Sequence, residues 1–525
     1  MPVNTTHPDY DANLSAWLRA RDVIAGEDAV KAGGEKYLPL LQEQTDDEYA
    51  TYKARASFFN ATARTAEGYV GLVFRRPPFL KLPGVAEVRD QKSEVRTSAL
   101  GKAMAVFAND ADMLGTPLAG YAKNVVSEVI SVGRCGSLMD WEGDAENRAY
   151  VSLYAAENIL NWRVERFNGR NLLTMVALAE KAEGRKQRSE VRSQEADDDE
   201  FEQNVVEQIR VLRLVDARSL RVAGPENLQP STFNFQPACQ VEIWQRVERK
   251  SKRDKTEWQK VETRIPLRFG KPLPLLPFVF HGPRHALPNV EKLPLADVIA
   301  VNLDHYRLDA DYKHGMHFTA LPTAWVSGFD KEDTLRIGSS TAWTTDTVGA
   351  AAGFLEYTGQ GLTTFERAMD RDERLMAVLG ARLLEGQKKV GETAESIELR
   401  QSGESSVLAN IAGSVSASLT QVLRWACWWN STEALPDDVT NEQVVMELNT
   451  DFSTTGLSAT ELTAVVKAWQ SGALSRDTML DLFRRGEILP EGRSNKEEIH
   501  LIGSDQKSAV PERSIALANP SGGNS

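Results

Sequence analysis

Cysteine is scarce in this sequence, and its copies stand far apart. The three cysteines, Cys135, Cys239 and Cys427, are odd in number and include no CxxC pair. The spacing gives no support to a zinc ribbon or a disulfide framework, because both need closely spaced pairs. We therefore expect the protein to work in a reducing compartment, of which the cytoplasm is the simplest.

Long hydrophobic runs are also missing. The longest candidate, VGAAAGFL at residues 348–355, falls far short of the ~20 residues that span a bilayer. The opening stretch MPVNTTHPDYDANLS has neither the basic region nor the apolar region of a secretory signal. We expect no membrane partner and no secretory signal.

Basic residues are fewer than acidic ones, with 61 Lys and Arg against 74 Asp and Glu, so the formal net charge is −13 at pH 7. This argues against tight binding to nucleic acid, because affinity for phosphates comes from Lys and Arg. It does not exclude a protein that lets nucleic acid slide past. Hydrophobic residues at 42% and charged residues at 26% are typical of a globular protein. With 525 residues, several subdomains are expected.

Hydrophobic periodicity predicts helices first and strands later. Residues 8–72 and 96–133 are expected to be helical, with the first stretch ending at the paired prolines 77–78. Between residues 181 and 202 the sequence is too charged to be buried and predicts a solvated loop. Strands are expected at 135–141, 149–164, 171–180, 205–215 and 273–283, the last as an edge or linker strand.

A β-hairpin is predicted from residues 240–248 and 256–265, around the basic tip 249–255. Trp244 and Trp258 are expected to stack across its two strands. A solvated hairpin end is the favoured interpretation of the tip, with DNA contact as the alternative. Further helices are predicted at 406–430 and, as two short amphipathic helices, within 457–489. The sequence from about residue 504 has the composition of a disordered tail.

The clearest pattern is a long helix, a compact β element and a second long helix. The second helix is marked by Thr363 and Glu366, the two positions of a capping box. Both helices have apolar residues at spacings of three and four, and charged residues elsewhere. The first stripe consists of Leu295, Ile299, Leu303, Tyr306 and Ala310, and the second of Leu362, Phe365, Met369, Met376, Leu379 and Leu383.

Motifs that carry chemistry are weak. Residues 386–393 have the glycine spacing of a phosphate-binding loop, but Glu392 stands where the loop needs lysine. Asp311, His314 and His317 share a helix face and form a candidate metal site, although a solvated or intersubunit face is favoured. His281 and His285 are interpreted as loop histidines. A helical spacing predicts that three tryptophans are core residues rather than a stacking surface, namely Trp425, Trp428 and Trp429.

Several segments, in order, resemble one known family. The matching pieces are EGYVGLVFRRPPF (67–79), SVGRCGSLMDW (131–141), AENILNWRV (156–164), LPLLPFVF (273–280), residues 294–323, GFLEYTGQGL (353–362) and residues 376–394. The chain resembles the portal proteins of tailed bacteriophages, in a branch often described only as a domain of unknown function. The likeness covers most of residues 45–430, and the tail after about residue 485 matches nothing.

The resemblance implies a predominantly helical α+β portal fold. Its expected parts are a wing at 1–293 with a helical part, a β-rich part and a charged loop at 181–204; a first stem helix at 294–318; a clip at 319–362; a second stem helix at 363–384; a tunnel loop at 385–406; a long helix and return to the wing at 407–485; and a small crown or flexible tail at 486–525.

The resemblance also implies a function without catalysis, metal or cofactor. Portal proteins form a ring of about twelve subunits at one capsid vertex, through which double-stranded DNA passes during packaging and ejection. The implied partners are the terminase large subunit, the major capsid and scaffold proteins and the head–tail adaptor proteins. The implied locations are the portal vertex of the virion and, during assembly, the host cytoplasm.

Two groups of site residues follow from these expectations. Candidates for facing DNA in the tunnel are Lys388, Lys389, Glu392 and Arg400. Candidates for contacts between stem helices of neighbouring subunits are Asp304, Arg307, Asp311, Arg367, Arg371 and Arg374. The alternatives are another virion structural protein, such as a minor head or scaffold component, and a metal-dependent enzyme that uses Asp311, His314 and His317.

Overall fold

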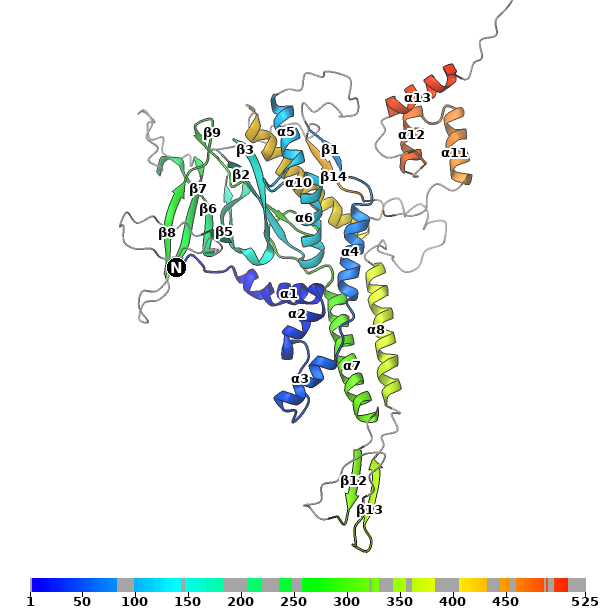
Figure 1. Cartoon of the computed structure of the whole chain (residues 1–525). Coiled ribbons are helices and arrows are strands. Elements are labelled where there is room, and N and C mark those ends of the chain that lie inside the picture. The colour runs from blue at the N-terminus through cyan, green and yellow to red at the C-terminus, as the bar shows by residue number, and fades with distance from the viewer. Residues whose placement is uncertain are drawn as a thin grey trace, which may run out of the picture. The chain divides into compact units, whose positions relative to one another are not determined.

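The fold is helix-rich α+β, as predicted. The computed structural model describes residues 2–82, 99–142, 147–167, 169–183, 205–219, 236–247, 257–320, 323–329, 343–355, 361–382, 406–431, 444–450, 452, 459–485, 488–489 and 495–508. It has two compact units, Met1–Thr450 and Asp451–Ser525 (Figure 1). Among the described helices, none is long and apolar enough to cross a membrane.

The first unit begins with helices, as the periodicity predicts. Thr45 and Glu48 form a complete capping box that starts the third of them. Arg21 joins the first helix to the rest of the unit, because its guanidinium binds both Glu128 and Glu157 at 2.6–3.1 Å. The four helices are α1 (Pro8–Ala25), α2 (Glu27–Ala32), α3 (Asp46–Arg55) and α4 (Ala61–Val73).

Three helices cover the small β-sheet of the first unit: α5 (Ala99–Asn109), α6 (Leu118–Val132) and α10 (Val407–Asn430). Helix α6 ends at Gly133, whose φ of 78° is a left-handed cap that glycine adopts without strain. Helix α10 is rich in small residues and packs against both helices and the sheet. The prediction that its three tryptophans are core residues is confirmed, since Trp425, Trp428 and Trp429 are buried.

The small sheet has three antiparallel strands in the order β11-β2-β3. Strand β11 is an edge strand, as predicted from its prolines. Gly136 in the central strand lies under the Phe278 ring, where a Cβ atom would meet ring carbons at 2.2 Å. The close approach therefore requires glycine. The strands are β2 (Cys135–Glu142), β3 (Arg148–Ala155) and β11 (Phe278–His281).

The larger sheet is an antiparallel meander of five strands in chain order, β4 to β8. The single strand expected at 149–164 is two strands, because the turn Ala156–Asn158 sends the chain from one sheet to the other. Trp162 and Phe280 pack edge-to-face between the sheets, with ring centroids 6.2 Å apart. The strands are β4 (Ile159–Phe167), β5 (Arg170–Glu183), β6 (Val205–Asp216), β7 (Pro237–Val247) and β8 (Glu257–Arg264).

The pairing of β7 with β8 sets how the two tryptophans meet. Trp244 lies opposite Lys260, and Trp258 lies opposite Arg246, so the two tryptophans are diagonal neighbours. A register shift after Ile243 moves the pairing by one residue and places both rings on the same face of the hairpin. The basic tip of this hairpin and most of the charged insert lie outside the described residues.

Two short strand pairs complete the first unit. Phe79–Lys81 (β1) pairs with Val445–Glu447 (β14), and Leu267–Arg268 (β9) pairs with Lys271–Pro272 (β10). The first pair joins segments that are far apart in the sequence, so residues after α10 return to the helical layer. Arg268 donates to the carbonyl oxygens of Trp428 and Ser431 and thereby holds the end of α10.

The second unit contains α11 (Ala459–Gln470), α12 (Arg476–Arg485) and α13 (Asn495–Ser508). The first two are the amphipathic helices that the sequence predicts. Helix α13 was not predicted and lies where a crown or flexible tail was expected. Asn495 accepts from Arg484 at 2.7 Å and donates to Asp481 at 3.0 Å, which ties the start of α13 to α12.

Candidate functional site

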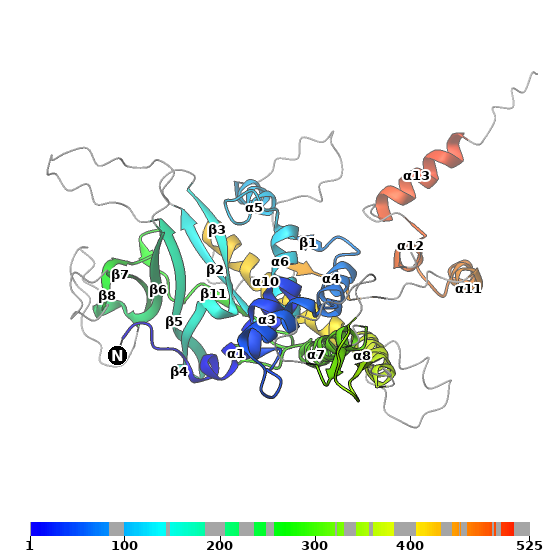
Figure 2. The ribbon, with the colours of Figure 1, turned by 60° about the horizontal axis from the view of Figure 1, so that its bottom comes forward.

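The candidate site is the paired helices α7 (Ala296–Ala320) and α8 (Leu362–Arg382) with the hairpin between them. Their observed bounds lie within two residues of the predicted 294–318 and 363–384. The helices lie side by side in the views of Figure 1 and Figure 2. The hairpin consists of β12 (Thr323–Ser327) and β13 (Ala351–Leu355). Chain connectivity places it at the end of α7 and the start of α8.

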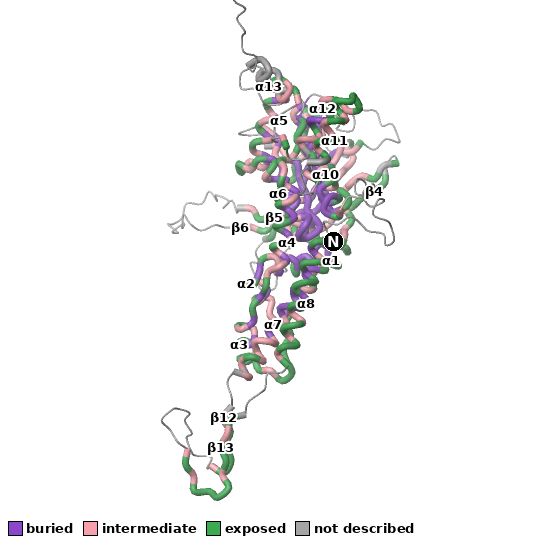
Figure 3. Tube along the Cα trace, turned by 90° about the vertical axis from the view of Figure 1, so that its right-hand side faces the viewer, coloured by how far each residue is buried: buried purple, intermediate pink, exposed green. Residues whose placement is uncertain are grey.

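The predicted apolar stripe of α7 is confirmed. All five residues of the stripe are buried, and they run from Leu295, just before the helix, to Ala310. The remaining faces of α7 are not simply solvated, because helices α1, α3, α4 and α8 all pack against it. Figure 3 shows the resulting band of buried and intermediate residues along α7.

Polar side chains on α7 form hydrogen bonds with the N-terminal helical region. Asn302 is fully buried and accepts from the Thr62 amide at 3.1 Å and hydroxyl at 2.8 Å. Its amide also donates to the Phe59 carbonyl at 2.7 Å. Asp309 accepts from the Ser57 backbone amide at 2.6 Å. Both polar atoms of the buried Asn302 side chain, Oδ1 and Nδ2, therefore have partners within the chain.

Three of the predicted intersubunit residues, Asp304, Arg307 and Asp311, make contacts inside the chain. Asp311 accepts a 2.6 Å hydrogen bond from the Tyr52 hydroxyl. Arg307 donates to the Tyr37 carbonyl at 2.9 Å and to Asp304 at 2.7 Å. Burial, and then the Asp311 carboxylate, raise the pKa of Tyr52 well above its ordinary value, so its proton stays in this bond.

The candidate metal residues do not converge on one point. Asp311 is bound to Tyr52, and the His314 ring packs edge-on against the same Tyr52 at 5.4 Å. His317 Nε2 lies 3.1 Å from an Arg55 nitrogen. Burial lowers the pKa of His314, and the positive charge of Arg55 lowers it further. In the described part of the chain, no group of three or more His, Cys, Asp or Glu residues is arranged to hold a metal ion.

Helix α8 has one buried side. The predicted stripe is largely confirmed, with Met376 buried and Leu362, Phe365, Met369 and Leu379 at intermediate exposure. Leu383 lies outside the described residues. The Tyr69 hydroxyl of α4 donates to the Gly380 carbonyl near the end of the helix. Asp372 is also buried in this stripe, which the sequence did not predict.

The outer side of α8 is exposed and mixed in character. Arg367, Arg371 and Arg374 are exposed, and the Arg371 side chain is 77% accessible. Leu375 and Val378 are 40% and 47% exposed, which is unusual for apolar residues on an amphipathic helix. The structure thus separates the predicted stem residues. Arg307 and Asp311 are bound within the chain, whereas the three α8 arginines face outward.

The hairpin at the end of the pair also exposes large apolar side chains. Trp325 in β12 and Phe354 in β13 are 46% and 55% exposed. A side chain on Gly353 would crowd the Trp325 indole, with a Cβ atom 2.9 Å from its nitrogen, so glycine lets the ring lie across the strand pair. Two-stranded hairpins are at best marginally stable alone in water. The exposed aromatic residues therefore form a surface suited to a protein partner.

His281 is not a loop histidine, which corrects the sequence interpretation. It lies in β11, is fully buried, and its two ring nitrogens contact the hydroxyls of Ser137 at 2.5 Å and Ser418 at 2.7 Å. Ser418 donates to the Val415 carbonyl at 2.9 Å, so it must accept from Nδ1–H of the ring. Nε2 then accepts from Ser137, which in turn accepts from Tyr121 at 2.6 Å.

Burial keeps this imidazole neutral. It disfavours the charged form of the ring and lowers the pKa of His281 to about 3. The network joins the small sheet to α6 and α10. Its atoms are buried, so a substrate has no access and the Ser–His pairs do not act as a nucleophile and base.

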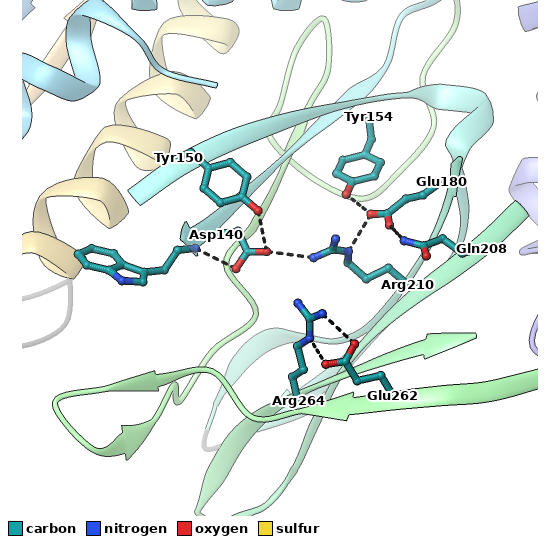
Figure 4. Close-up of polar contacts among 9 residues, drawn as sticks. Asp140, Tyr150, Tyr154, Glu180, Gln208, Arg210, Glu262 and Arg264 are labelled. Atoms are coloured by element: carbon teal, nitrogen blue, oxygen red, sulfur yellow. Dashed lines mark hydrogen bonds and ion pairs between the residues drawn. The ribbon is translucent and has the colours of Figure 1, made fainter. Parts of the chain in front are cut away.

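A charged cluster between the two sheets was missed by the sequence reasoning (Figure 4). Arg210 of β6 donates to Glu180 of β5 at 2.7 Å and to Asp140 of β2 at 3.0 Å. Burial alone lowers the pKa of Arg210, but the two carboxylates outweigh it and the net shift is upward. Tyr154 and Gln208 also donate to Glu180. The signal in the sequence that could have indicated this cluster is the presence of charged residues, such as Arg210 and Glu180, within otherwise apolar strands.

The tunnel-loop candidates cannot be placed. Lys388, Lys389, Glu392 and Arg400 all lie outside the described residues. The phosphate-loop-like segment 386–393 lies outside them as well. Among the histidines discussed above, His285 is exposed near the turn that follows β11, as predicted.

Comparison with known proteins gives one family match. Residues 294–430 match a family described as a domain of unknown function, DUF4055. The matched segment runs from the start of α7 to the end of α10 and therefore includes the whole candidate site. No curated protein matches the chain.

Solved structures give weak similarities. One chain is from a structure titled "Neck of empty GTA particle computed with C6 symmetry", at 9% identity and a TM-score of 0.35 over 82% of this chain and 91% of that one. Another is from the "Virion of native gene transfer agent (GTA) particle", at 9% identity and a TM-score of 0.35 over 89% of this chain and 99% of that one. These TM-scores are too low to define a shared fold.

Proposed function

We propose that this chain is a structural protein of a phage-derived particle and, more specifically, a portal protein. In this proposal α7 and α8 are the stem, the β12–β13 hairpin belongs to the clip, and double-stranded DNA passes through a ring of subunits. The observation that supports the proposal best is the outer side of α8, where charged and apolar residues are exposed in the described part of the chain.

Helical geometry arranges these outer residues in two ridges. At about 100° per residue, Arg367, Arg371 and Arg374 fall within one narrow sector opposite the buried stripe. Glu366, Asp370 and Glu373 fall in a neighbouring sector, and all three are exposed. A single helix therefore presents a basic ridge and an acidic ridge that point in different directions.

Two ridges of opposite charge suit a head-to-tail contact between copies. The basic ridge of one subunit then meets the acidic ridge of the next, and contacts of this type close into a ring when the rotation allows. Leu375 and Val378 lie beside the basic ridge and gain burial in such a contact. The favourable pairing is electrostatic and sets the direction of assembly as well as its strength.

The experiment is imaging of the purified full chain by negative-stain microscopy, with mass photometry to count subunits. Rings with a central hole are expected. The variant Arg367→Glu/Arg371→Glu/Arg374→Glu is expected to abolish rings, and so is Asp370→Lys/Glu373→Lys. A chain that carries both sets of changes has its ridges exchanged and is expected to form rings again.

Other outcomes separate the alternatives. Rings that survive both single reversals would refute the ridge contact. Filaments or particles without a hole would favour a minor head or scaffold component. A strictly monomeric protein that contains bound metal would overturn the portal proposal and favour the enzyme alternative.

The passage of DNA is a separate part of the proposal. The formal net charge of −13 suits a conduit whose wall does not trap phosphates. Lys388 and Lys389 are proposed to give transient contacts with the DNA backbone in the tunnel loop. Replacing both with alanine is expected to change packaging or retention of DNA while rings still form. Unchanged packaging would remove this role.

A further inference from the structure

The larger sheet has a face that no other layer of the described chain covers. Its side chains lie on the side away from the three-stranded sheet, and they line a hollow of about 990 Å³. The N-terminal residues Pro2 to Thr5 form one wall. Trp244 and Trp258, on β7 and β8, form part of the opposite side. We call this hollow the sheet trough.

The wall at the N-terminal side is firmly attached. The His7 amide donates to the Leu160 carbonyl at 2.9 Å, and the Asn161 side chain donates to the Thr5 carbonyl at 2.8 Å. The His7 ring also stacks on Trp162, with centroids 4.0 Å apart. These contacts fix the segment along the edge strand β4, so the trough has a defined width.

The floor of the sheet trough is apolar. Ala177, Ile209 and Val211 are buried in it, and Met175 and the two tryptophans pack against them. The tryptophans are only partly buried, so their rings remain available to a ligand. An apolar floor with accessible aromatic side chains binds apolar side chains or flat groups.

The rim of the trough is positively charged. It carries four cations and two carboxylates, namely Arg163, Arg213, Arg246, Lys260, Glu207 and Glu242. Glu242 is nearly buried and is shared by Lys260 at 3.3 Å and Arg213 at 3.7 Å. Arg246 pairs with Glu207 at 2.9 Å. The excess of positive charge is unusual on a chain whose formal net charge is −13.

We propose that the sheet trough binds an extended acidic peptide segment of a partner protein. In an extended peptide, successive side chains point to opposite sides, so alternate apolar residues reach the floor and the intervening carboxylates reach the rim. Arg163 and Arg213 are the guanidinium groups that receive those carboxylates, each through charge-assisted hydrogen bonds. The proposal does not depend on ring formation, because all of these residues come from one chain.

Nucleic acid fits the trough less well. Tryptophan and arginine together are typical of single-strand binding sites. However, Glu207 and Glu242 belong to the rim, where each repels a phosphate chain that carries a charge on every nucleotide. A peptide can place apolar residues at these positions and carboxylates elsewhere.

The test uses the full chain and a fluorescein-labelled octapeptide of alternating Asp and Leu, with binding followed by anisotropy. Saturable binding is expected, and an octapeptide of alternating Lys and Leu is expected not to bind. The variant Arg163→Ala/Arg213→Ala is expected to weaken binding by about tenfold or more. Trp258→Ala is expected to weaken it to a similar extent through the lost floor contact.

Two matched controls locate the effect. Arg264→Ala removes an arginine from β8 on the opposite face of the sheet, where Arg264 pairs with Glu262. Trp325→Ala removes an exposed tryptophan from the β12–β13 hairpin. Both are expected to leave the peptide affinity unchanged. Equal weakening by Arg264→Ala would overturn the proposal in favour of general charge attraction.

Three further outcomes would also overturn it. The absence of peptide binding would show that the trough does not take this ligand class. Tighter binding of a labelled dT12 oligonucleotide than of the acidic peptide would assign the trough to nucleic acid. A change in subunit number on Trp258→Ala would assign it to a second copy of the chain.

Discussion

Helices α7 and α8 lie side by side and have similar lengths, yet they use their polar residues in opposite ways. Helix α7 directs Asn302, Asp309 and Asp311 to partners in the N-terminal helices of the same chain. Helix α8 leaves Arg367, Arg371 and Arg374 exposed. One helix is built into its own subunit, and the other is covered on one side only.

This difference indicates where to look for the function of the protein. Polar groups that are buried and satisfied contribute to the stability of the single chain. Exposed charged ridges contribute little to that stability, because water screens them. We therefore expect substitutions on α7 to lower the free energy of unfolding and substitutions on α8 to weaken assembly. Four measurements test this difference between the two helices.

The largest effect is expected for Asn302→Leu on α7. This change leaves the buried Thr62 amide and hydroxyl without their partner, at a cost of about 3 kcal/mol in the free energy of unfolding, whereas the Phe59 carbonyl keeps its bond from the Ala61 amide. The urea midpoint measured by tryptophan fluorescence gives the result. Asp304→Ala, at an exposed position on the same helix, is the control and should change the midpoint little. Equal losses would remove the distinction between buried and exposed positions of α7.

The second prediction uses pH to test a buried, satisfied polar group in the core of the first unit, namely His281. His281 is neutral in the folded protein, with a pKa of about 3, whereas an unfolded histidine has a pKa of about 6.5. The unfolded state therefore binds more protons below that value, and stability falls as the pH drops from about 6.5 toward 3. Between these two pKa values the expected contribution is about 1.4 kcal/mol per pH unit.

Urea unfolding at pH 6, 5 and 4 measures this slope in the natural chain and in His281→Gln. The variant is expected to be less stable at pH 6, because Ser137 and Ser418 lose a matched partner, but to lose less stability on acidification. Identical pH slopes for the two proteins would show that His281 is not the acid-sensitive group.

A smaller effect is expected for Tyr52→Phe, which removes the hydrogen bond to Asp311 of α7. The loss is about 1.5 kcal/mol, the lower end for a bond to a charged group. Tyr312→Phe is the matched control, because Tyr312 donates to Glu366 of α8 at an exposed position. Its thermal midpoint should shift less than that of Tyr52→Phe. The reverse order would contradict the assignment of α7 to the subunit core.

The smallest effect on stability is expected for Arg371→Ala/Arg374→Ala on α8. Both side chains are exposed, so the free energy of unfolding should change by less than about 0.5 kcal/mol. The same variant should weaken assembly in sedimentation velocity experiments. A loss of more than about 1 kcal/mol in the unfolding of the single chain would show that this ridge stabilises its own subunit, and the contrast would fail.

Much of the α7–α8 block was predictable from the sequence. Periodicity placed both helices and their buried stripes, because side chains three and four residues apart share a face in any helix. The same reasoning identified the edge strand β11, since proline cannot donate to a neighbouring strand on both sides. It could not identify the buried position of Asp372, the contact of Arg307 with Tyr37 or the contact of Asp311 with Tyr52, because the last two depend on helices far away in the chain.

The sites that the sequence did not predict also depend on contacts between elements that are far apart in the chain. Arg210 meets Asp140 only because the two sheets stack, and it meets Glu180 because β5 pairs with β6. His281 meets Ser137 and Ser418 only because β11 pairs with β2 under α10. The sheet trough needs Trp244, Arg163 and the N-terminal segment from three separate parts of the sequence.

By itself, the sequence determined the helix-rich α+β class, the two long helices and the side of each that is apolar. These properties follow from local periodicity and from the short sequence range of helix hydrogen bonds. Tertiary structure alone decided which polar residues are satisfied within the chain and which remain on the surface. That division depends on contacts between residues hundreds of positions apart, and burial makes such contacts obligatory because a buried polar group without a partner is costly.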